Sequence, residues 1–218
     1  MAQERGLKAV TLSIDDFYLT RKDQIQLAKD HPRNSLLQQR GYPGTHDVKL
    51  GSDTLQSLKN IQNLGQVNIP AYDKSKNQGQ GDRFEKSEWK QISGPLDIVF
   101  LEGWMLGFTP VSEATLSSEE LREVNRLLKD YASWDELLDA FVQLIPEKID
   151  YVIDWRIEAE EKMKALGKPG MSMEDIRSYI LKFIPAYEIY LPRLRENLPA
   201  RTDSIQFVLR RDRTVSLF

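Results

Sequence analysis

The chain contains no cysteine and only two histidines, His31 and His46, among its 218 residues. The lack of cysteine excludes disulfides, thiolate catalysis and thiolate-bound metal centres within these residues. A metal centre built from imidazoles is not expected either, because such centres need more histidines than the chain has. A Mg²⁺ ion held by carboxylates remains compatible with the composition.

The sequence also has no excess of positive charge and no long apolar run. Its formal net charge is -3, and no cluster of lysine and arginine is interleaved with aromatic residues, so nucleic acid is not an expected partner. No stretch approaches the roughly 18 apolar residues of a membrane span, and MAQERGLKAV at the N-terminus lacks the apolar core of a signal peptide. We therefore expect no membrane association and a cytoplasmic location.

The residues that are present predict one α/β domain over residues 1–218. Hydrophobic residues make up 40% of the chain and charged residues 29%, as in ordinary globular domains. Short apolar segments, which predict strands, alternate with longer amphipathic segments, which predict helices. This alternation is typical of a mainly parallel sheet with helices on both faces. The predicted strands are residues 8–14, 67–70, 98–101 and 151–154.

The amphipathic segments carry signals for helix starts and stops. Asp47 is the predicted N-cap of a helix within residues 46–63. Ser117 and Ser118 precede two glutamates, so they predict the start of one or two helices that end at Pro146.

The C-terminal third predicts one more helix and a hairpin. Ser172 is a predicted cap for a helix over residues 172–197, in which Pro185 and Pro192 should cause a kink or a break. Residues 204–218 form two β-rich runs around a polar centre, which is typical of a terminal hairpin.

Charged and polar side chains follow all four predicted strands. In an open parallel sheet, ligands bind beyond the carboxyl ends of the strands. Each of these side chains alone is commonly just a strand end that meets water. Their repetition at one edge indicates a ligand site. They are, in chain order, Asp15 and Asp16, then Tyr72, Asp73 and Lys74, then Glu102, and last Arg156.

The apolar run that ends at Glu102 has the form of a Walker B strand, in which a terminal carboxylate holds Mg²⁺ directly or through water. An aspartate after a neighbouring strand is suited to accept the proton of a substrate hydroxyl that attacks a phosphate. One of Asp15 and Asp16 would then be the base and the other would position substrate or loop. The sequence leaves open which is which.

Two polar segments outside the strands supply further candidates. The Gly/Pro turn GYPGTHD presents His46 and Asp47 at a helix start, where they would contact a substrate or simply form a turn with an N-cap. Arg83, in GQGDR, is either a substrate clamp or a solvated arginine of a polar loop.

Six segments, taken in order, resemble the D-glycerate 3-kinases of plants and cyanobacteria: LSIDDFYLT, RGYPGTHD, IPAYDKSKNQGQGDR, IVFLEGW, WRIEAE and GMS…F…YE.Y. This family is part of the P-loop kinase superfamily, together with uridine kinase and phosphoribulokinase. The resemblance implies a three-layer P-loop kinase-like domain that uses ATP and Mg²⁺ to phosphorylate the 3-hydroxyl of D-glycerate. It also implies residue roles, by motif: Asp15 as catalytic base, Asp47 and residues 72–74 as acceptor site, Glu102 as Walker B acid, and Arg156 as an arginine of a mobile lid at about residues 155–175.

One motif of that family is not found in these 218 residues. The family begins with a strand and a Walker A loop, GxxxxGK[ST], whereas the only Gly-Lys pair here, Gly167 and Lys168, is followed by Pro169. We therefore expect that the N-terminal strand and this loop are missing and that the chain alone is inactive. The missing strand would lie between residues 98–101 and 151–154, which would then pair directly or leave a slot.

Two alternatives to the kinase remain open at this stage. One is a kinase-like binding or regulatory protein without a nucleotide site, which the missing GxxxxGK[ST] loop favours. The other is an α/β domain whose strand-end acids have no catalytic role.

Overall fold

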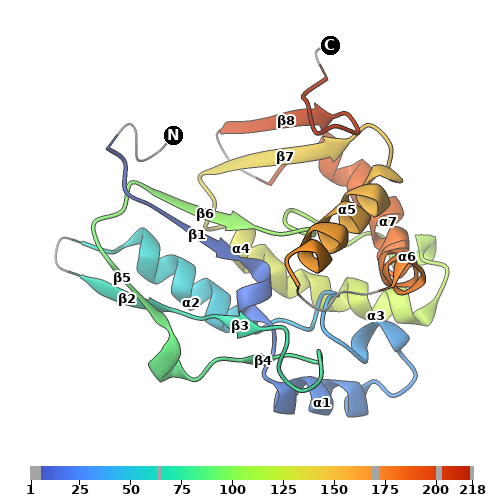
Figure 1. The fold of residues 1–218 in the computed structure, drawn as a ribbon, viewed down its shortest axis with the longest axis horizontal. Coiled ribbons are helices and arrows are strands. Elements are labelled where there is room, and N and C mark those ends of the chain that lie inside the picture. Colours follow the sequence, from blue (N-terminus) through green and yellow to red (C-terminus); the bar gives the residue numbers. More distant parts are fainter. Residues whose placement is uncertain (1–5, 63–64, 168–171, 200–202, 217–218) are drawn as a thin grey trace. The chain divides into compact units, whose positions relative to one another are not determined.

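A computed structural model describes residues 6–62, 65–167, 172–199 and 203–216. The chain divides into two compact units, Met1–Leu137 and Leu138–Phe218 (Figure 1). Each unit is described by itself. The single domain over residues 1–218 stays a prediction.

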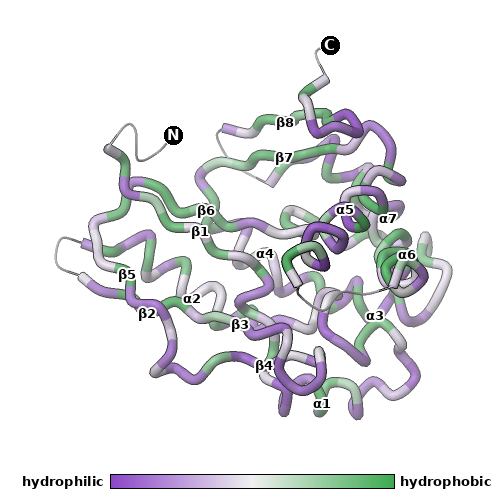
Figure 2. Tube along the Cα trace, viewed as in Figure 1, coloured by the Kyte–Doolittle hydropathy of each residue, from purple (hydrophilic) through white to green (hydrophobic). Residues whose placement is uncertain are grey.

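The first unit contains a parallel pair of strands, β1 (Ala9–Ser13) and β6 (Ile98–Glu102). Both strands were predicted from their apolar runs. Figure 2 shows them largely in the colour of hydrophobic residues. The pairing runs from Ala9 opposite Ile98 to Ser13 opposite Glu102, so the two strands end at the same edge. Val10 and Leu12 alternate into the core and fix the face on which β1 is buried.

The predicted caps at Asp47 and Ser118 are confirmed. Asp47 Oδ1 accepts the N–H of Leu50 at 3.0 Å, and Ser118 Oγ accepts that of Leu121 at 3.3 Å. Both caps satisfy amides that a helix start leaves without partners. The helices of this unit are α1 (Arg21–Asp30), α2 (Val48–Lys59), α3 (Glu119–Leu127) and the short α4 (Ala132–Asp135).

The α2 helix packs closely on α4 because Gly51 leaves room for a large ring. A Cβ atom on Gly51 would lie 2.5 Å from the ring of Trp134, which is 1% exposed. The indole N–H of Trp134 donates to the carbonyl of Val48 at 2.9 Å. The start of α2, and with it the turn before it, is thereby fixed.

The predicted strand at residues 67–70 exists as β2 (Gln66–Ile69) but does not join the parallel pair. It pairs antiparallel with β5 (Lys90–Ser93). A second small antiparallel pair follows, β3 (Tyr72–Asp73) with β4 (Asp82–Arg83). Of the residues expected at the end of a parallel strand, Tyr72 and Asp73 therefore lie on β3, and Lys74 follows it.

The second unit contains a parallel pair of its own, β7 (Ala140–Pro146) and β8 (Asp203–Leu209). Between them come α5 (Tyr151–Ala165), α6 (Met173–Leu181) and α7 (Ile184–Glu196). After β8 the chain reverses, and Leu209 bridges antiparallel to Val215. This reversal is the predicted C-terminal hairpin, although β8 makes its long pairing with β7.

Two predictions in this unit are wrong. Residues 140–146 were expected to end a helix but form β7, in which Phe141 and Ile145 are buried while Val142 and Leu144 are exposed. Residues 151–154 were expected to form a strand but begin α5. A short apolar run does not distinguish strand from helix by its period. Because residues 151–154 are helical, they neither pair with the strand at residues 98–101 nor leave a strand-wide slot beside it.

The two prolines of the last helical segment behave differently. Pro185 lies in the first turn of α7, where its missing N–H breaks no helical hydrogen bond. The predicted break is therefore confirmed at Pro185. Pro192 lies inside α7 and does not end it.

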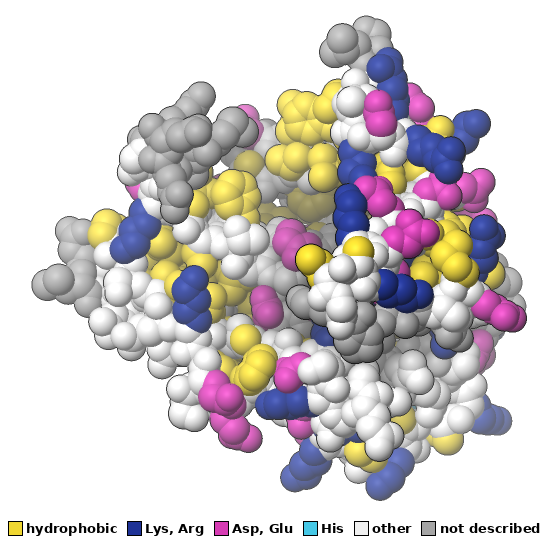
Figure 3. Space-filling view, viewed as in Figure 1, with side chains coloured by type: hydrophobic (Ala, Val, Ile, Leu, Met, Phe, Trp, Pro, Cys, Tyr) yellow, Lys and Arg dark blue, Asp and Glu magenta, His cyan; other side chains and the backbone are white. Residues whose placement is uncertain are grey.

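No helix in the described part of the chain has the length and apolarity to cross a membrane. On the face seen in Figure 3, acidic and basic side chains are interspersed, as the small net charge leads one to expect. A cytoplasmic location and the lack of a nucleic-acid partner stay predictions.

Candidate active site

Three acidic residues, Asp15, Asp16 and Glu102, lie together at the carboxyl edge of the β1–β6 pair. Directly after β1, a short 3₁₀ turn (Ile14–Phe17) carries Asp15 and Asp16, and Glu102 ends β6 opposite Ser13. An open pocket of about 440 Å³ lies at this edge. Five of the predicted site residues therefore come together. The lining residues are Ser13, Asp15, Asp16, Tyr72, Lys74, Glu102, Gly103 and Trp104.

The two neighbouring aspartates have different surroundings. The N–H of Ser13 donates to Asp16 Oδ2 at 3.1 Å, and Ser13 Oγ accepts the N–H of Asp15 at 3.3 Å, which makes Ser13 the cap of the turn. Burial raises the pKa of Asp16. The hydrogen bond from the Ser13 amide acts in the opposite direction, and the charge of Asp15 raises the pKa further. Both aspartates line the pocket, but Asp16 is bound to the backbone amide of Ser13, whereas the side chain of Asp15 is 27% exposed and pairs with a lysine.

The ammonium group of Lys74 forms an ion pair with Asp15 Oδ2. Lys74 follows β3, and the turn that holds it is closed by Asp73, whose Oδ1 accepts from the N–H and the Oγ of Ser75 at 2.8 and 2.6 Å. These two hydrogen bonds lower the pKa of Asp73. Asp73 therefore shapes the turn, and it is Lys74 that lines the pocket.

Arg83, on β4, is fixed by two partners and is not a solvated arginine. Its Nη1 lies 3.2 Å from Asp47 Oδ2, and its Nη2 donates to the carbonyl of Tyr18 at 2.8 Å. Only 12% of its side chain is exposed. Asp47 thus serves as the cap of α2 with one oxygen and as the partner of Arg83 with the other.

His46 is buried beside this cluster. Its ring is stacked on that of Tyr18, with 4.4 Å between the centroids, and its Nδ1 lies 2.7 Å from the hydroxyl of Tyr131. Burial lowers the pKa of His46 to about 3, although the charge of Asp15 acts in the opposite direction. Tyr131 was not predicted from the sequence, because 85 residues separate it from its partner and no local motif marks it.

Comparison with known proteins places these residues in a family. D-glycerate 3-kinase, chloroplastic, of Arabidopsis thaliana is 40% identical over 200 residues, which are 90% of this chain and 44% of that protein. The solved D-glycerate 3-kinase from Cryptococcus neoformans is 34% identical, with a TM-score of 0.92 over 98% of this chain and 80% of that one. The chain belongs to the D-glycerate 3-kinase family. The resemblance seen in the six sequence segments and the α/β fold class are thereby confirmed.

A further relative of this D-glycerate 3-kinase family member is the probable ATP-dependent kinase TDA10 of Saccharomyces cerevisiae, 35% identical over 190 residues. They are 82% of this chain and 65% of the yeast protein. The chain thus spans less than two thirds of the length of the Arabidopsis and the yeast relative. No protein-family model matches it.

The predicted lid residues of this family member lie in the second unit. Arg156, on α5, pairs with the buried carboxylate of Glu160 at 2.5 Å, and Lys162 pairs with Glu158 at 2.5 Å. Both pairs join residues one helical turn apart, but only the Lys162–Glu158 pair is exposed as surface pairs are. Residues 168–171 of the expected lid lie outside the described part of the chain, so its lid role stays a prediction.

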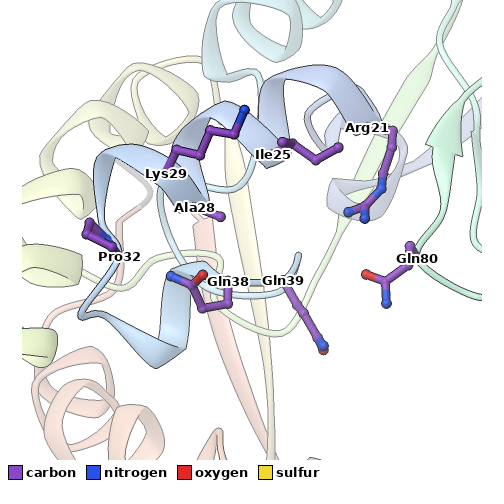
Figure 4. A pocket seen from close by; sticks show the side chains of 8 residues that line it. All are labelled: Arg21, Ile25, Ala28, Lys29, Pro32, Gln38, Gln39 and Gln80. Atoms are coloured by element: carbon purple, nitrogen blue, oxygen red, sulfur yellow. The ribbon is translucent and has the colours of Figure 1, made fainter.

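A second open pocket of about 390 Å³ in the first unit lies against one face of α1 (Figure 4). None of the described residues that line it is acidic, so it offers no carboxylate for proton transfer. The acidic pocket is therefore the better candidate for a site of proton transfer. The lining residues of this second pocket are Arg21, Ile25, Ala28, Lys29, Pro32, Gln38, Gln39 and Gln80.

A metal ion in the acidic pocket would depend on Glu102. Within residues 6–62, 65–167, 172–199 and 203–216, no three histidine or acidic side chains are arranged to hold a metal. Mg²⁺ usually takes one or two carboxylates and completes its shell with water and substrate phosphates. Glu102, exposed at the end of β6 and part of the pocket wall, suits that role.

Proposed function

We propose that this protein is an ATP-dependent small-molecule kinase that transfers the γ-phosphoryl group of ATP to the 3-hydroxyl of D-glycerate. The observation that carries the proposal is the Asp15–Lys74 ion pair, which shares one open pocket with Glu102 at the carboxyl edge of β1 and β6. The names of the Arabidopsis and Cryptococcus relatives support D-glycerate as acceptor, and that of the yeast relative supports ATP.

In this proposal Asp15 is the general base. Its carboxylate accepts the proton of the 3-hydroxyl while the hydroxyl oxygen attacks the γ-phosphorus, and the bond from that phosphorus to the oxygen bridging the β- and γ-phosphates breaks. Asp16 is less suited, because its Oδ2 already accepts the amide of Ser13. Lys74 offers an ammonium group beside the base, which suits the carboxylate of D-glycerate or the transferring phosphoryl group.

Glu102 would hold Mg²⁺ together with the ATP phosphates, and the ion would neutralise charge on the transferring group. Arg83 and Asp47 would keep the α2 start and the β3–β4 pair in place around the acceptor, because they join those two segments. Tyr72 lines the pocket and would contact the acceptor. Arg156 would supply a further cation from the lid.

The phosphate cradle is the part of this site that the 218 residues do not contain, since no GxxxxGK[ST] occurs in them. We propose that they carry the acceptor side and do not transfer phosphate by themselves. The alternative is a kinase-like protein that binds the acceptor for a regulatory purpose.

Two measurements test this proposal. Calorimetric titration of the 218-residue chain with D-glycerate should give saturable binding, weaker for L-glycerate, and should be unaffected by Asp30→Asn on the exposed end of α1. A chimera in which a strand and a GxxxxGK[ST] loop precede residue 6 should phosphorylate D-glycerate. Binding without transfer in a folded chimera that binds ATP would favour the regulatory alternative. No binding and no transfer would refute D-glycerate as acceptor.

A further inference from the structure

The ring of His46 is held by aromatic rings on several sides. It stacks on Tyr18 with 22° between the ring planes, and Tyr131 and Trp134 meet it edge-on, with centroids at 5.7 and 6.2 Å. His46 and Tyr18 also form an isolated antiparallel bridge. Since His46 is only 4% exposed, its ring has little freedom to turn over. The two ring nitrogens therefore have fixed and different surroundings.

The hydrogen bonds of Tyr131 decide which nitrogen of His46 carries the proton. The N–H of Gly44 donates to the Tyr131 oxygen at 3.0 Å, and the backbone N–H of His46 also acts on that oxygen. With amide donors on the oxygen, the hydroxyl proton of Tyr131 points to its remaining neighbour, His46 Nδ1 at 2.7 Å. Nδ1 is then an acceptor, and the neutral ring carries its proton on Nε2.

The opposite tautomer does not satisfy this network. A proton on Nδ1 would bring a third donor to the oxygen of Tyr131, and the hydroxyl proton, on a residue that is 5% exposed, would lose its acceptor. A charged imidazolium would carry the same Nδ1 proton and is disfavoured by burial as well. His46 is thus a neutral hydrogen-bond donor through Nε2.

The Nε2 atom of His46 is buried and has no hydrogen-bond partner among the described residues. A buried N–H without an acceptor costs free energy, which an oxygen of a bound molecule would recover. His46 lies behind the wall of the acidic pocket and does not line it. Tyr18, which stacks on the His46 ring, meets the ring of the pocket residue Tyr72 edge-on with 5.4 Å between the centroids. The charge of Asp15 also acts on His46. D-glycerate carries hydroxyl and carboxylate oxygens that suit such a donor.

We propose that Tyr131 is a positioning residue that fixes His46 as the Nε2–H tautomer, so that His46 donates a hydrogen bond to the acceptor molecule and does not act as a base. This inference rests on the proposed function for the identity of the acceptor. The tautomer itself does not depend on it. Because Nε2 is closed to water, an oxygen of the acceptor reaches it through a local shift of the surrounding side chains.

Long-range ¹H–¹⁵N correlation NMR of the labelled 218-residue chain tests the tautomer. The chain has only two histidines, so a His31→Gln variant leaves the signals of His46 alone. We expect one tautomer, protonated on Nε2, from pH 5 to 9. Tyr131→Phe should produce a mixture, while Tyr190→Phe, which changes a buried tyrosine of α7, should not. A wild-type ring protonated on Nδ1 would overturn the inference, whether or not Tyr131→Phe folds.

Titration with D-glycerate tests the donor role. His46→Phe keeps an aromatic ring but removes Nε2–H, and it should weaken D-glycerate binding by at least about tenfold, the effect of one hydrogen bond to a charged group. His46→Gln, which retains an N–H donor, should recover part of the affinity. Equal affinity in the wild type and His46→Phe overturns the inference and leaves the proposed function standing. Failure of the wild type to bind D-glycerate refutes the proposed acceptor, and the tautomer experiment still decides the role of Tyr131.

Discussion

The ammonium group of Lys74 pairs with the carboxylate of Asp15, although 59 residues separate them in the sequence. The pair joins the turn after β1 to the turn after β3. Asp16 takes no part in this ion pair, and its Oδ2 accepts the amide N–H of Ser13. Two adjacent acids at the end of one strand thus take different parts. Asp15 faces the pocket with a cation beside it, and Asp16 closes the turn that presents Asp15.

This division predicts different effects of removing each acid. In a phosphate-transferring chimera, Asp15→Asn should lower kcat by about 10² to 10⁴, the usual share of a general base, with little change in ATP affinity. Asp16→Asn should act mainly on stability, because it weakens the cap at Ser13. Steady-state kinetics and thermal unfolding separate the two. A near-normal kcat for Asp15→Asn would remove Asp15 from the role of base.

The assignment of Glu102 to Mg²⁺ predicts a selective defect. Glu102→Gln keeps the shape of the side chain and removes its charge, so turnover should require more Mg²⁺, while D-glycerate affinity should stay within about twofold of the wild type. Activity is measured across a Mg²⁺ series, and D-glycerate binding by calorimetry. Glu88→Gln, on the exposed turn before β5, is the matched control. Loss of D-glycerate binding with normal Mg²⁺ dependence would assign Glu102 to the acceptor instead.

Local sequence patterns were enough to predict the centre of this site. The apolar run of β1, the acids that follow it and the cap at Asp47 all depend on neighbours within a few residues. Glu102 follows for the same reason, as the end of a second apolar run. The contact of Asp15 with Lys74 arises in a different way from the predicted one, because Lys74 follows β3 of the β3–β4 pair, which was not predicted.

The predictions that failed involve choices that local patterns do not determine. Residues 140–146 alternate buried and exposed side chains as a strand does, but apolar residues occur in both sets and the polar Gln143 is in the buried one. The sequence therefore shows no clear period of two, and a helix suits it equally well. The antiparallel pairing of β2 with β5 depends on a partner more than twenty positions away. The hydrogen bond from Tyr131 to His46 spans 85 positions and involves no motif.

The buried side chains of His46 and Asp135 make the free energy of unfolding depend on pH in opposite directions. The folded-state pKa of His46 is lowered to about 3, so its contribution is complete above its ordinary value near 6.5 and is lost as pH falls toward 3. Burial raises the pKa of Asp135 to about 6, against a hydrogen bond from the amide of Gly107. Its contribution is therefore complete below its ordinary value of 3.8 and is lost as pH rises through 6. Between pH 4 and 6 the two contributions oppose each other.

Removing the carboxyl group of Asp135 should therefore make the pH dependence due to His46 measurable. In Asp135→Asn, the free energy of unfolding should fall by about 1.4 kcal/mol more per pH unit than in Asp135→Asn/His46→Gln as pH decreases from 6 to 4, because one additional proton binds the unfolded chain. Urea unfolding at each pH measures the difference. Parallel curves for the two variants would show that His46 titrates normally in the folded state.

The last prediction concerns nucleotide binding by the 218 residues alone. P-loop kinases hold the β- and γ-phosphates with backbone N–H groups of a glycine-rich loop and with its lysine. The only Gly-Lys pair in this sequence is followed by Pro169, which has no N–H to donate and no hydroxyl for Mg²⁺. Calorimetric titration of the 218-residue chain with Mg-ATP should therefore show no micromolar binding, while D-glycerate still binds. The chimera that carries a GxxxxGK[ST] loop should bind Mg-ATP under the same conditions. Micromolar affinity in the 218-residue chain would mean that another of its loops cradles the phosphates, and the basic residues of α5 would then be the first to test by substitution.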